Sequence, residues 1–423
     1  MTDKNLRWVA RAALIPCSVM LAGLTGGPAH AATTMSATSP TVFAPAPSGA
    51  VKPDDITMLD GLLYLTYQNN AGPDGSPTGS HSTVVTLDST GHAGHIWSIA
   101  GRVDGLTADP THHRVLATAN EDLNSTLYAI TPGDKTPTHY TYNPDPAQKG
   151  TDGSNGGTDS ISIAADGSIY LAHSNPDPAL PAPNDAPALY RATLSGSTAS
   201  LTPVFGVNDQ ASVINPAAGA PTTTKMSLTD PDSNRIIAVA GQPTLVQDAQ
   251  ADSKLVFVSD LTAATPTLKQ LNLHNATGAA AVTPQLDDLE QITGPGTLYI
   301  ADQGSGVIYA LDTATMTPGT IVVSQPKPAK GDLANRAGVG TLNPATGIVT
   351  PMLTALQSPK GLLFVPAAAS TSPAGVTPPQ AVDSGRADPG TRNTALILSG
   401  STLVGIAAAA ALIITARRRT PRR

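Results

Sequence analysis

Acidic residues recur at the start of short apolar segments in the middle of the chain, and they are the strongest candidates for chemistry. They stand immediately before segments such as Ile56-Thr57 and Leu106-Thr107, at intervals of roughly 50 to 65 residues. If the fold gathers these segments around one point, their carboxylates converge there. Sites that offer only carboxylate and amide oxygens favour Ca²⁺ over transition metals. The acidic set is Asp54, Asp55, Asp104, Asp159, Asp287, Asp288 and Glu290.

Within this set the candidate metal ligands are Asp55, Asp104, Asp159, Asp288 and Glu290, and Ca²⁺ is the one candidate cofactor. An alternative stays open, because an Asp side chain often accepts hydrogen bonds from its own loop or from a neighbouring repeat. A Gly-rich stretch, Asp152 to Asp159, looks like a calcium loop, but its spacing does not match the EF-hand pattern.

A second set of polar residues follows the second apolar segment of each repeat. Such positions fall on loops, where a rigid scaffold usually carries its function. The candidate ligand-binding residues are Gln68, Asn69, Asn120, Glu121, His173, Asn175 and Gln303. Catalytic residues stay unassigned, because the sequence has no Gly-x-Ser-x-Gly elbow, His-Glu-x-x-His pair, phosphate loop or Cys/His cluster.

The elements that carry these residues form a four-strand repeat. Each copy has an Asp-rich start, two apolar strands around a tight turn, and a third and fourth strand. The pattern predicts an all-β fold, a β-propeller of four-stranded blades, with six blades expected and seven as the alternative. Thr41-Val42-Phe43-Ala44 is a candidate closing strand. The clearest copies start at Asp54, Asp104, Asp159, Lys225 and Leu289.

Loop lengths predict which face binds a ligand. Turns such as Asp60-Gly61, Asp166-Gly167 and Asp230-Pro231-Asp232 are short and read as hairpin turns between first and second strands. The loops on the other face are long and irregular: 69–81, 120–125, 174–188 and 241–253. The long-loop face is therefore the expected binding face.

The repeats resemble those of the NHL and SMP-30/gluconolactonase-like propellers. The resemblance spans residues 54–366 and rests on blade motifs: Gly-Leu-Thr-Ala-Asp-Pro at 105–110, Ala-Asp-Gly-Ser-Ile-Tyr at 165–170, Thr-Leu-Tyr-Ile-Ala-Asp at 297–302 and Ser-Pro-Lys-Gly-Leu-Leu-Phe at 358–364. It implies a divalent cation held in the channel by Glu, Asn and Asp. Pro53-Asp54-Asp55-Ile56 stands where those hydrolases have Glu-Gly-Pro, and Met226 occupies the corresponding start of the fourth repeat.

Both ends of the chain carry membrane signals. Lys4, Arg7 and Arg11 precede an apolar run and Ala29-His30-Ala31, which predicts a cleaved signal helix over residues 1–31. Residues 394–416 contain no charge and would span about 35 Å as a helix, enough for a hydrocarbon core of about 30 Å. The arginine-rich tail, 417–423, is expected in the cytoplasm.

The segments between these signals complete the organisation. Residues 32–53 form a lead-in, 54–366 the propeller, and 367–393 a stalk rich in Pro, Ala, Ser and Thr. The tail resembles that of Gram-positive surface proteins of the actinobacterial type, but it lacks Leu-Pro-x-Thr-Gly. We therefore expect a single-pass type I anchor with the propeller on the extracellular face of the membrane.

Composition agrees with an exported domain. The single cysteine, Cys17, lies in the signal, so the expected mature chain has no disulfide. Without three basic residues and Asp3 of the signal, and without five tail arginines, the 24 Lys+Arg and 31 Asp+Glu become 16 and 30. This acidic balance excludes nucleic acid as an expected partner.

Two functions fit these features. The first is a surface recognition or scaffolding module without catalysis, held at the membrane by 394–416, with an extracellular protein, glycan or small molecule as its partner. The alternative is a Ca²⁺-type metal-dependent hydrolase or lactonase of the SMP-30-like class.

Overall fold

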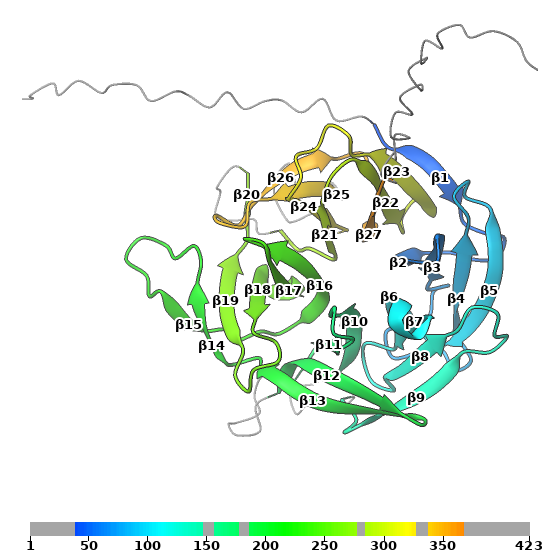
Figure 1. Ribbon diagram of the computed structural model, residues 1–423, viewed down its shortest axis with the longest axis horizontal. Helices are drawn as coiled ribbons and strands as arrows, with labels where there is room; N and C mark the ends of the chain where they lie inside the picture. Colours follow the sequence, from blue (N-terminus) through cyan, green and yellow to red (C-terminus); the bar gives the residue numbers. More distant parts are fainter. Residues whose placement is uncertain (1–38, 147–155, 177–185, 277–283, 327–336, 368–423) are drawn as a thin grey trace, which may run out of the picture. The chain divides into compact units, whose positions relative to one another are not determined.

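The computed structural model describes residues 39–146, 156–176, 186–276, 284–326 and 337–367. In these residues the only helices are two single 3-10 turns, η1 (Pro110–His112) and η2 (Gln250–Asp252). All other regular structure is β, and the sheets surround a common centre (Figure 1). The β-propeller fold predicted from the repeats is therefore confirmed.

The first strands follow the chain in order. One four-stranded sheet contains β2 (Pro53–Leu59), β3 (Leu62–Tyr67), β4 (His81–Leu87) and β5 (Ala93–Ala100). Next comes an eight-stranded sheet of β6 (Val103–Asp109), β7 (Arg114–Ala119), β8 (Thr126–Ile130), β9 (Thr138–Asn143), β10 (Gly157–Ile163), β11 (Ile169–Ser174), β12 (Pro187–Ser195) and β13 (Thr198–Gly206).

Three sheets complete the fold. A six-stranded sheet holds β14 (Gln210–Val213), β15 (Thr223–Lys225), β16 (Pro231–Val239), β17 (Gln242–Ala249), β18 (Lys254–Ser259) and β19 (Thr267–Asn272). A five-stranded sheet holds β20 (His274–Asn275), β21 (Leu289–Ile292), β24 (Thr320–Gln325), β25 (Gly338–Leu342) and β26 (Ile348–Leu353). The last sheet holds β1 (Thr41–Pro45), β22 (Gly296–Asp302), β23 (Val307–Asp312) and β27 (Pro359–Pro366).

The number of sheets differs from the predicted number of blades. There are five sheets, because β9 and β13 pair in parallel and join two four-stranded antiparallel groups into one sheet. Similar parallel pairing adds β14 to β19 and β20 to β26. Periodicity along a sequence cannot reveal such pairing at outer edges, since each extra strand is short.

The last two sheets exchange strands. After β21 the chain leaves the five-stranded sheet, forms β22 and β23 of the last sheet, and returns to form β24, β25 and β26. It then ends as β27, which pairs with β22, while β1 covers the outer edge of β23. The last sheet therefore contains both the first and the last described strands of the chain.

The fourth repeat was placed wrongly by the sequence analysis. Its first strand is β16, which begins at Pro231, so Asp230-Pro231-Asp232 is not a hairpin turn. Lys225 ends β15, and Met226 is buried in the core. The segment 241–253 is mostly β17 and not a loop. The competing signal was turn chemistry, since Asp and Pro are favoured in turns.

Apolar side chains between neighbouring sheets hold them together. One cluster joins Tyr170 and Leu189 to Leu245 and Val256, and four similar clusters lie between other sheets. A sixth lies between the two four-stranded groups of the eight-stranded sheet. Burial of each such side chain contributes about 1.5–3 kcal/mol. The innermost strands are buried on both faces, as in β10, so their backbones are held firmly at the centre.

The predicted signal (1–31), stalk (367–393), membrane helix (394–416) and tail (417–423) fall almost entirely outside the described residues. No helix among the residues that the structure describes is long and apolar enough to span a membrane.

Candidate functional site

The strands β2, β6, β10, β16, β21 and β27 lie closest to the centre (Figure 1). Residues in or next to these strands line a common cavity. In β2 the pairing register jumps from Pro53 to Ile56, and β6, β10, β16 and β27 show the same irregularity. Such a bulge turns the side chain of an extra residue to a new direction. The first residue of each bulge, with Asp287 just before β21, makes up what we call the channel ring: Asp54, Asp104, Asp159, Asp232, Asp287 and Lys360.

The cavity at the channel ring is strongly acidic. Its volume is about 530 Å³. Ten carboxylate side chains line it, against three cationic ones, Arg102, Arg235 and Lys360. Such an imbalance in a buried site must be relieved by protons or by a bound cation, because unpaired buried charges are costly.

Asp55 and Asp288, each next to a channel-ring residue, tie neighbouring strands together. Asp55 accepts a hydrogen bond from the backbone N–H of Leu106 at 2.6 Å, and Asp288 accepts one from Leu362 at 2.7 Å. At the same position in β6 stands Gly105, where a Cβ atom would lie 2.5 Å from the carbonyl oxygen of Asp159. Asp55 and Asp288 therefore accept hydrogen bonds from neighbouring repeats, which was the alternative to metal binding for the acidic set.

Arg235 lines the same cavity and bonds to two neighbouring strands. Its guanidinium lies 2.9 Å from Asp288 and 3.2 Å from Glu290. It also donates to the carbonyl oxygens of Leu289 and Leu362, at 3.0 and 2.9 Å. Glu290 and Asp288 thus serve a buried ion-pair network that links β16 to β21 and β27.

Two other cations neutralise part of the ring. Lys360 forms an ion pair with Asp287. Arg102 lies 2.8 Å from Asp104 and 2.7 Å from Glu121. Asp159 and Asp232 have no such partner among the described residues, so the negative charge is concentrated on their side of the cavity.

Burial shifts the ionisation of the ring. It raises the pKa of Asp54 to about 7 and the pKa of Asp232 to about 8. It also raises the pKa of Asp159 well above its ordinary value, and the negative charge of the neighbouring Asp232 adds to this shift. Removal of these carboxylates from water disfavours their charged forms.

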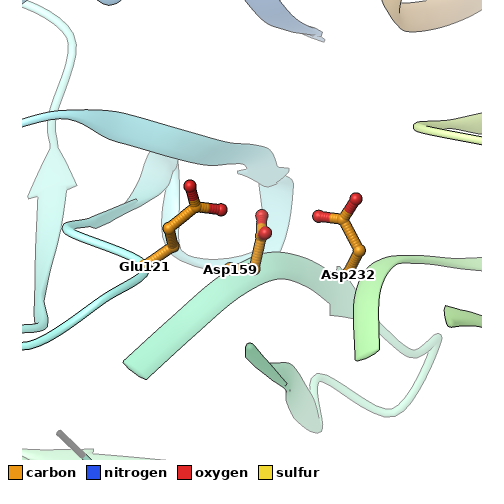
Figure 2. A group of neighbouring side chains, drawn as sticks. All are labelled: Glu121, Asp159 and Asp232. Atoms are coloured by element: carbon orange, nitrogen blue, oxygen red, sulfur yellow. The ribbon is translucent and has the colours of Figure 1, made fainter. Parts of the chain in front are cut away.

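Three carboxylates, two of them without a cationic partner among the described residues, form a candidate metal site. Glu121 follows β7, Asp159 lies in β10 and Asp232 lies in β16, and one oxygen atom from each lies within 4.8 Å of the others (Figure 2). The Nε2 of Gln250 donates to Asp232 at 2.6 Å and fixes its orientation. Nearby in the ring, Oδ2 of Asp104 is buried and has no hydrogen-bond partner.

The donor set fits a hard cation. All the candidate ligands are carboxylate oxygens, and the site offers neither nitrogen nor sulfur, which suits Ca²⁺. The orphaned Oδ2 of Asp104 is a further oxygen that lacks a partner in the protein. Glu121, Asp159 and Asp232, with Asp104 beside them, would hold the ion.

The predicted ligand-binding residues separate into two groups. Glu121, Asn175 and Gln303 line the cavity. Gln68 is buried behind it, where its Nε2 donates to Asp104 at 2.8 Å and its Oε1 accepts from Gln303 at 3.1 Å.

The other three bind the protein itself. Asn69 holds the backbone of Val51 and the hydroxyl of Thr83. His173 is buried, with Nδ1 at 2.6 Å from the carbonyl oxygen of Pro187. Asn120 accepts from the N–H of Arg102 and lies apart from the channel cavity.

Sequence reasoning missed Asp232, Lys360, Arg102 and Arg235. A signal was present for two of them, because Pro231-Asp232 and Pro359-Lys360 repeat the Pro53-Asp54 pattern at the start of an inner strand. Arg102 and Arg235 gave no signal, since isolated basic residues usually remain on the surface.

Comparisons with known proteins add little beyond the fold. No protein-family model matches the chain, and no curated protein matches it. Among solved structures the chain is similar to a periplasmic gluconolactonase, PpgL, of Pseudomonas aeruginosa, with 9% sequence identity and a TM-score of 0.43. The match covers 74% of this chain and 88% of the gluconolactonase. A protein from Lactobacillus plantarum matches with 11% sequence identity and a TM-score of 0.41, over 75% of this chain and 89% of that protein.

A xylan β-1,4-xylosidase from Bacillus halodurans matches with 11% sequence identity and a TM-score of 0.35, over 71% of this chain and 54% of the xylosidase. Likeness at this level does not extend to activity, so the function is argued from the site.

Proposed function

We propose that Glu121, with Asp159 and Asp232 of the channel ring, binds a divalent cation of the Ca²⁺ type and that the surrounding cavity recognises a small, oxygen-rich ligand. The observation that carries this proposal is the convergence of Glu121, Asp159 and Asp232 within 4.8 Å. A cation there would relieve the repulsion among the three carboxylates, of which only Glu121 has a basic partner, Arg102, in the part of the chain that the structure describes. When bound, it would supply a positive centre for hydroxyl or carboxylate oxygens of a ligand.

The cavity supports a binding role. Arg235 lines the same cavity, where its ion pair with Asp288 leaves one fewer carboxylate without a cation. Asn175 and Gln303 place amide groups at the wall, where they can orient a polar molecule.

Calorimetric titration of the EDTA-treated full chain with CaCl₂ tests this function. We expect saturable binding that weakens at least about tenfold in Asp159→Asn and in Asp232→Asn. Asp166→Asn, in an exposed hairpin turn, is the matched control and should leave the affinity unchanged. Absence of binding at millimolar Ca²⁺, or equal affinity in all four proteins, would reject the metal site.

A metal-dependent hydrolase is the second candidate, and Asp54 favours it. Asp54 lines the same cavity, accepts a hydrogen bond of 3.2 Å from Gln303, and has a pKa raised by burial to about 7. A carboxylate with a pKa near the working pH suits a general base. The bound ion would polarise an ester or lactone carbonyl, while Asp54 would take a proton from water.

A pH-stat assay with glucono-δ-lactone separates the two candidates. Hydrolysis that needs Ca²⁺ and disappears in Asp54→Asn, with Ca²⁺ affinity retained, would establish the enzyme. Ca²⁺ binding without any hydrolysis would leave the recognition module.

We also propose that the protein works at the cell surface. The support is the sequence alone: a cleavable signal over 1–31, a stalk over 367–393 and an apolar segment over 394–416 followed by arginines. An extracellular protein, glycan or small molecule is then the accessible partner.

A further inference from the structure

A second cavity lies apart from the channel ring, between the loop that precedes β4 and the strands β8 and β9. We call it the side groove. Its volume is about 640 Å³. The residues that matter most for its chemistry are His81, Asn120, Asn124, Tyr128, His139 and Thr141.

The wall of the side groove is firmly built. Asn120 is buried, accepts from the N–H of Arg102 at 3.0 Å and donates to the carbonyl oxygen of Asn124 at 3.0 Å. Asn124 in turn donates to the carbonyl oxygen of Asp74 at 3.2 Å. A Cβ atom at Gly75 or Gly101 would collide with the side chain of Asn120, so glycine at both positions lets the loop close around it. The groove is therefore a preformed feature.

Two aromatic rings provide a surface in the groove. The rings of Tyr128 and His139 lie 5.0 Å apart, and Thr126 is hydrogen-bonded to Nε2 of His139 at 2.5 Å. His139 is exposed, so one face of its ring remains open. In the described part of the chain, neither the hydroxyl of Tyr128 nor the imidazole of His81 has a hydrogen-bond partner.

The charge of the side groove differs from that of the channel. Its lining has one carboxylate, Asp74, and neither lysine nor arginine, whereas the channel cavity has ten carboxylates. Hydroxyl, amide and imidazole groups both donate and accept hydrogen bonds. Such a lining suits an uncharged ligand that carries many hydroxyl groups, and an open aromatic face suits the C–H side of a sugar ring.

We propose that the side groove binds a neutral carbohydrate, independently of any metal in the channel. His139 and Tyr128 stack against a sugar ring, and His81, Asn124 and Thr141 bond its hydroxyl groups. The loop 120–125 separates the two sites: Glu121 and Asp122 face the channel cavity, while Asn120 and Asn124 line the groove.

The test uses calorimetric titration of the full chain with four neutral hexasaccharides: cellohexaose, xylohexaose, maltohexaose and N-acetylchitohexaose. We expect at least one to bind with a Kd of about 1 mM or tighter, in EDTA as well as in Ca²⁺. Its affinity should fall at least about tenfold in Tyr128→Ala and His139→Ala. Thr78→Arg, at the exposed rim, should weaken binding without touching the core.

Two controls keep this result separate from the proposed function. His113→Ala alters an exposed histidine at an αL turn outside the groove and should leave sugar affinity unchanged. Glu121→Gln should weaken Ca²⁺ binding but not sugar binding. No binding of any hexasaccharide at about 10 mM, or equal binding by Thr78→Arg, His139→Ala and the parent protein, would overturn the proposal. Sugar binding that vanishes in EDTA or in Glu121→Gln would assign the sugar to the channel and overturn it as well.

Discussion

Asp54 illustrates the electrostatic state of the channel ring. It is buried, and its Oδ1 accepts a hydrogen bond of 3.2 Å from Gln303. Lys360 stabilises its charged form, but this attraction is smaller than the effect of burial, so the pKa rises to about 7. A side chain in this state makes stability depend on pH.

Asp54→Asn should remove part of that dependence. The folded-state pKa of about 7 lies above the ordinary value of 3.8, so the native state holds the proton more tightly than the unfolded state. The resulting stabilisation is complete below about pH 3.8 and is lost as the pH rises through about 7. In EDTA, the variant should match the parent protein near pH 3.5 and exceed it near pH 8.5 by on the order of a few kcal/mol. Denaturant unfolding at both pH values measures the free energy of unfolding of each protein. An equal decrease of that free energy between the two pH values in both proteins would contradict the prediction.

Gly105 shows why one bulge position accepts no side chain. Gly105→Ala would place a Cβ atom 2.5 Å from the carbonyl oxygen of Asp159 and should destabilise the protein by about 1–3 kcal/mol. The matched control is Gly294→Ala, since a Cβ atom there meets nothing within 4 Å, and its effect should stay below about 1 kcal/mol. Thermal melts compare the two, and similar shifts would show that the close contact is relieved cheaply.

At the scale of strands, Arg235 connects elements that are distant in sequence. It extends from β16 and bonds to Leu289 in β21 and Leu362 in β27. Arg235→Met leaves Asp288 and Glu290 without their cation and should cost about 3–5 kcal/mol. Arg191→Met, on an exposed position of β12, should change stability by less than about 0.5 kcal/mol. Equal midpoints of urea unfolding would show that water or protons replace the guanidinium without loss.

The sequence was informative wherever a strand and its chemistry repeat together. Asp54, Asp104 and Asp159 each precede an apolar strand, so their common position could be predicted. Asp232 was missed although Pro231-Asp232 repeats the Pro53-Asp54 pattern, because Asp230-Pro231-Asp232 also has the composition of a turn and only the pairing with β17 shows that a strand begins there. Lys360 was missed although Pro359-Lys360 repeats the same pattern, because its side chain is cationic where the other repeats carry an acidic residue.

The structural roles of Asn69, Asn120 and His173 were also beyond sequence reasoning. Each stands where a loop residue could meet a ligand, and each instead bonds the protein's own groups. Whether a polar loop residue contacts a ligand or bonds the protein's own groups depends on atoms from other strands. A local sequence pattern does not contain that information.

For the whole molecule, the last sheet determines how the ring of sheets is completed. It contains β1 from the start of the described chain and β27 from its end. Completion therefore needs the chain from Thr41 to Pro366.

The proposed membrane anchor and its orientation are open to a direct test. With the cell wall removed, protease applied to intact cells should cut within 367–393 and release a soluble propeller, because the arginines after residue 416 should remain in the cytoplasm. A propeller that stays protected while a C-terminal tag is digested would reverse the assignment.

The exchange of strands between the last two sheets gives the protein a natural place to be divided. A break in residues 313–319 separates a piece that ends with β23 from a piece that holds β24 to β27. Since β21 pairs with β24 and β22 pairs with β27, each half supplies strands that the other needs for two different sheets. Co-expressed halves should therefore reassemble and co-purify, and neither half should be soluble alone. The two fragments could then be fused to other proteins, and their assembly would report that those proteins associate.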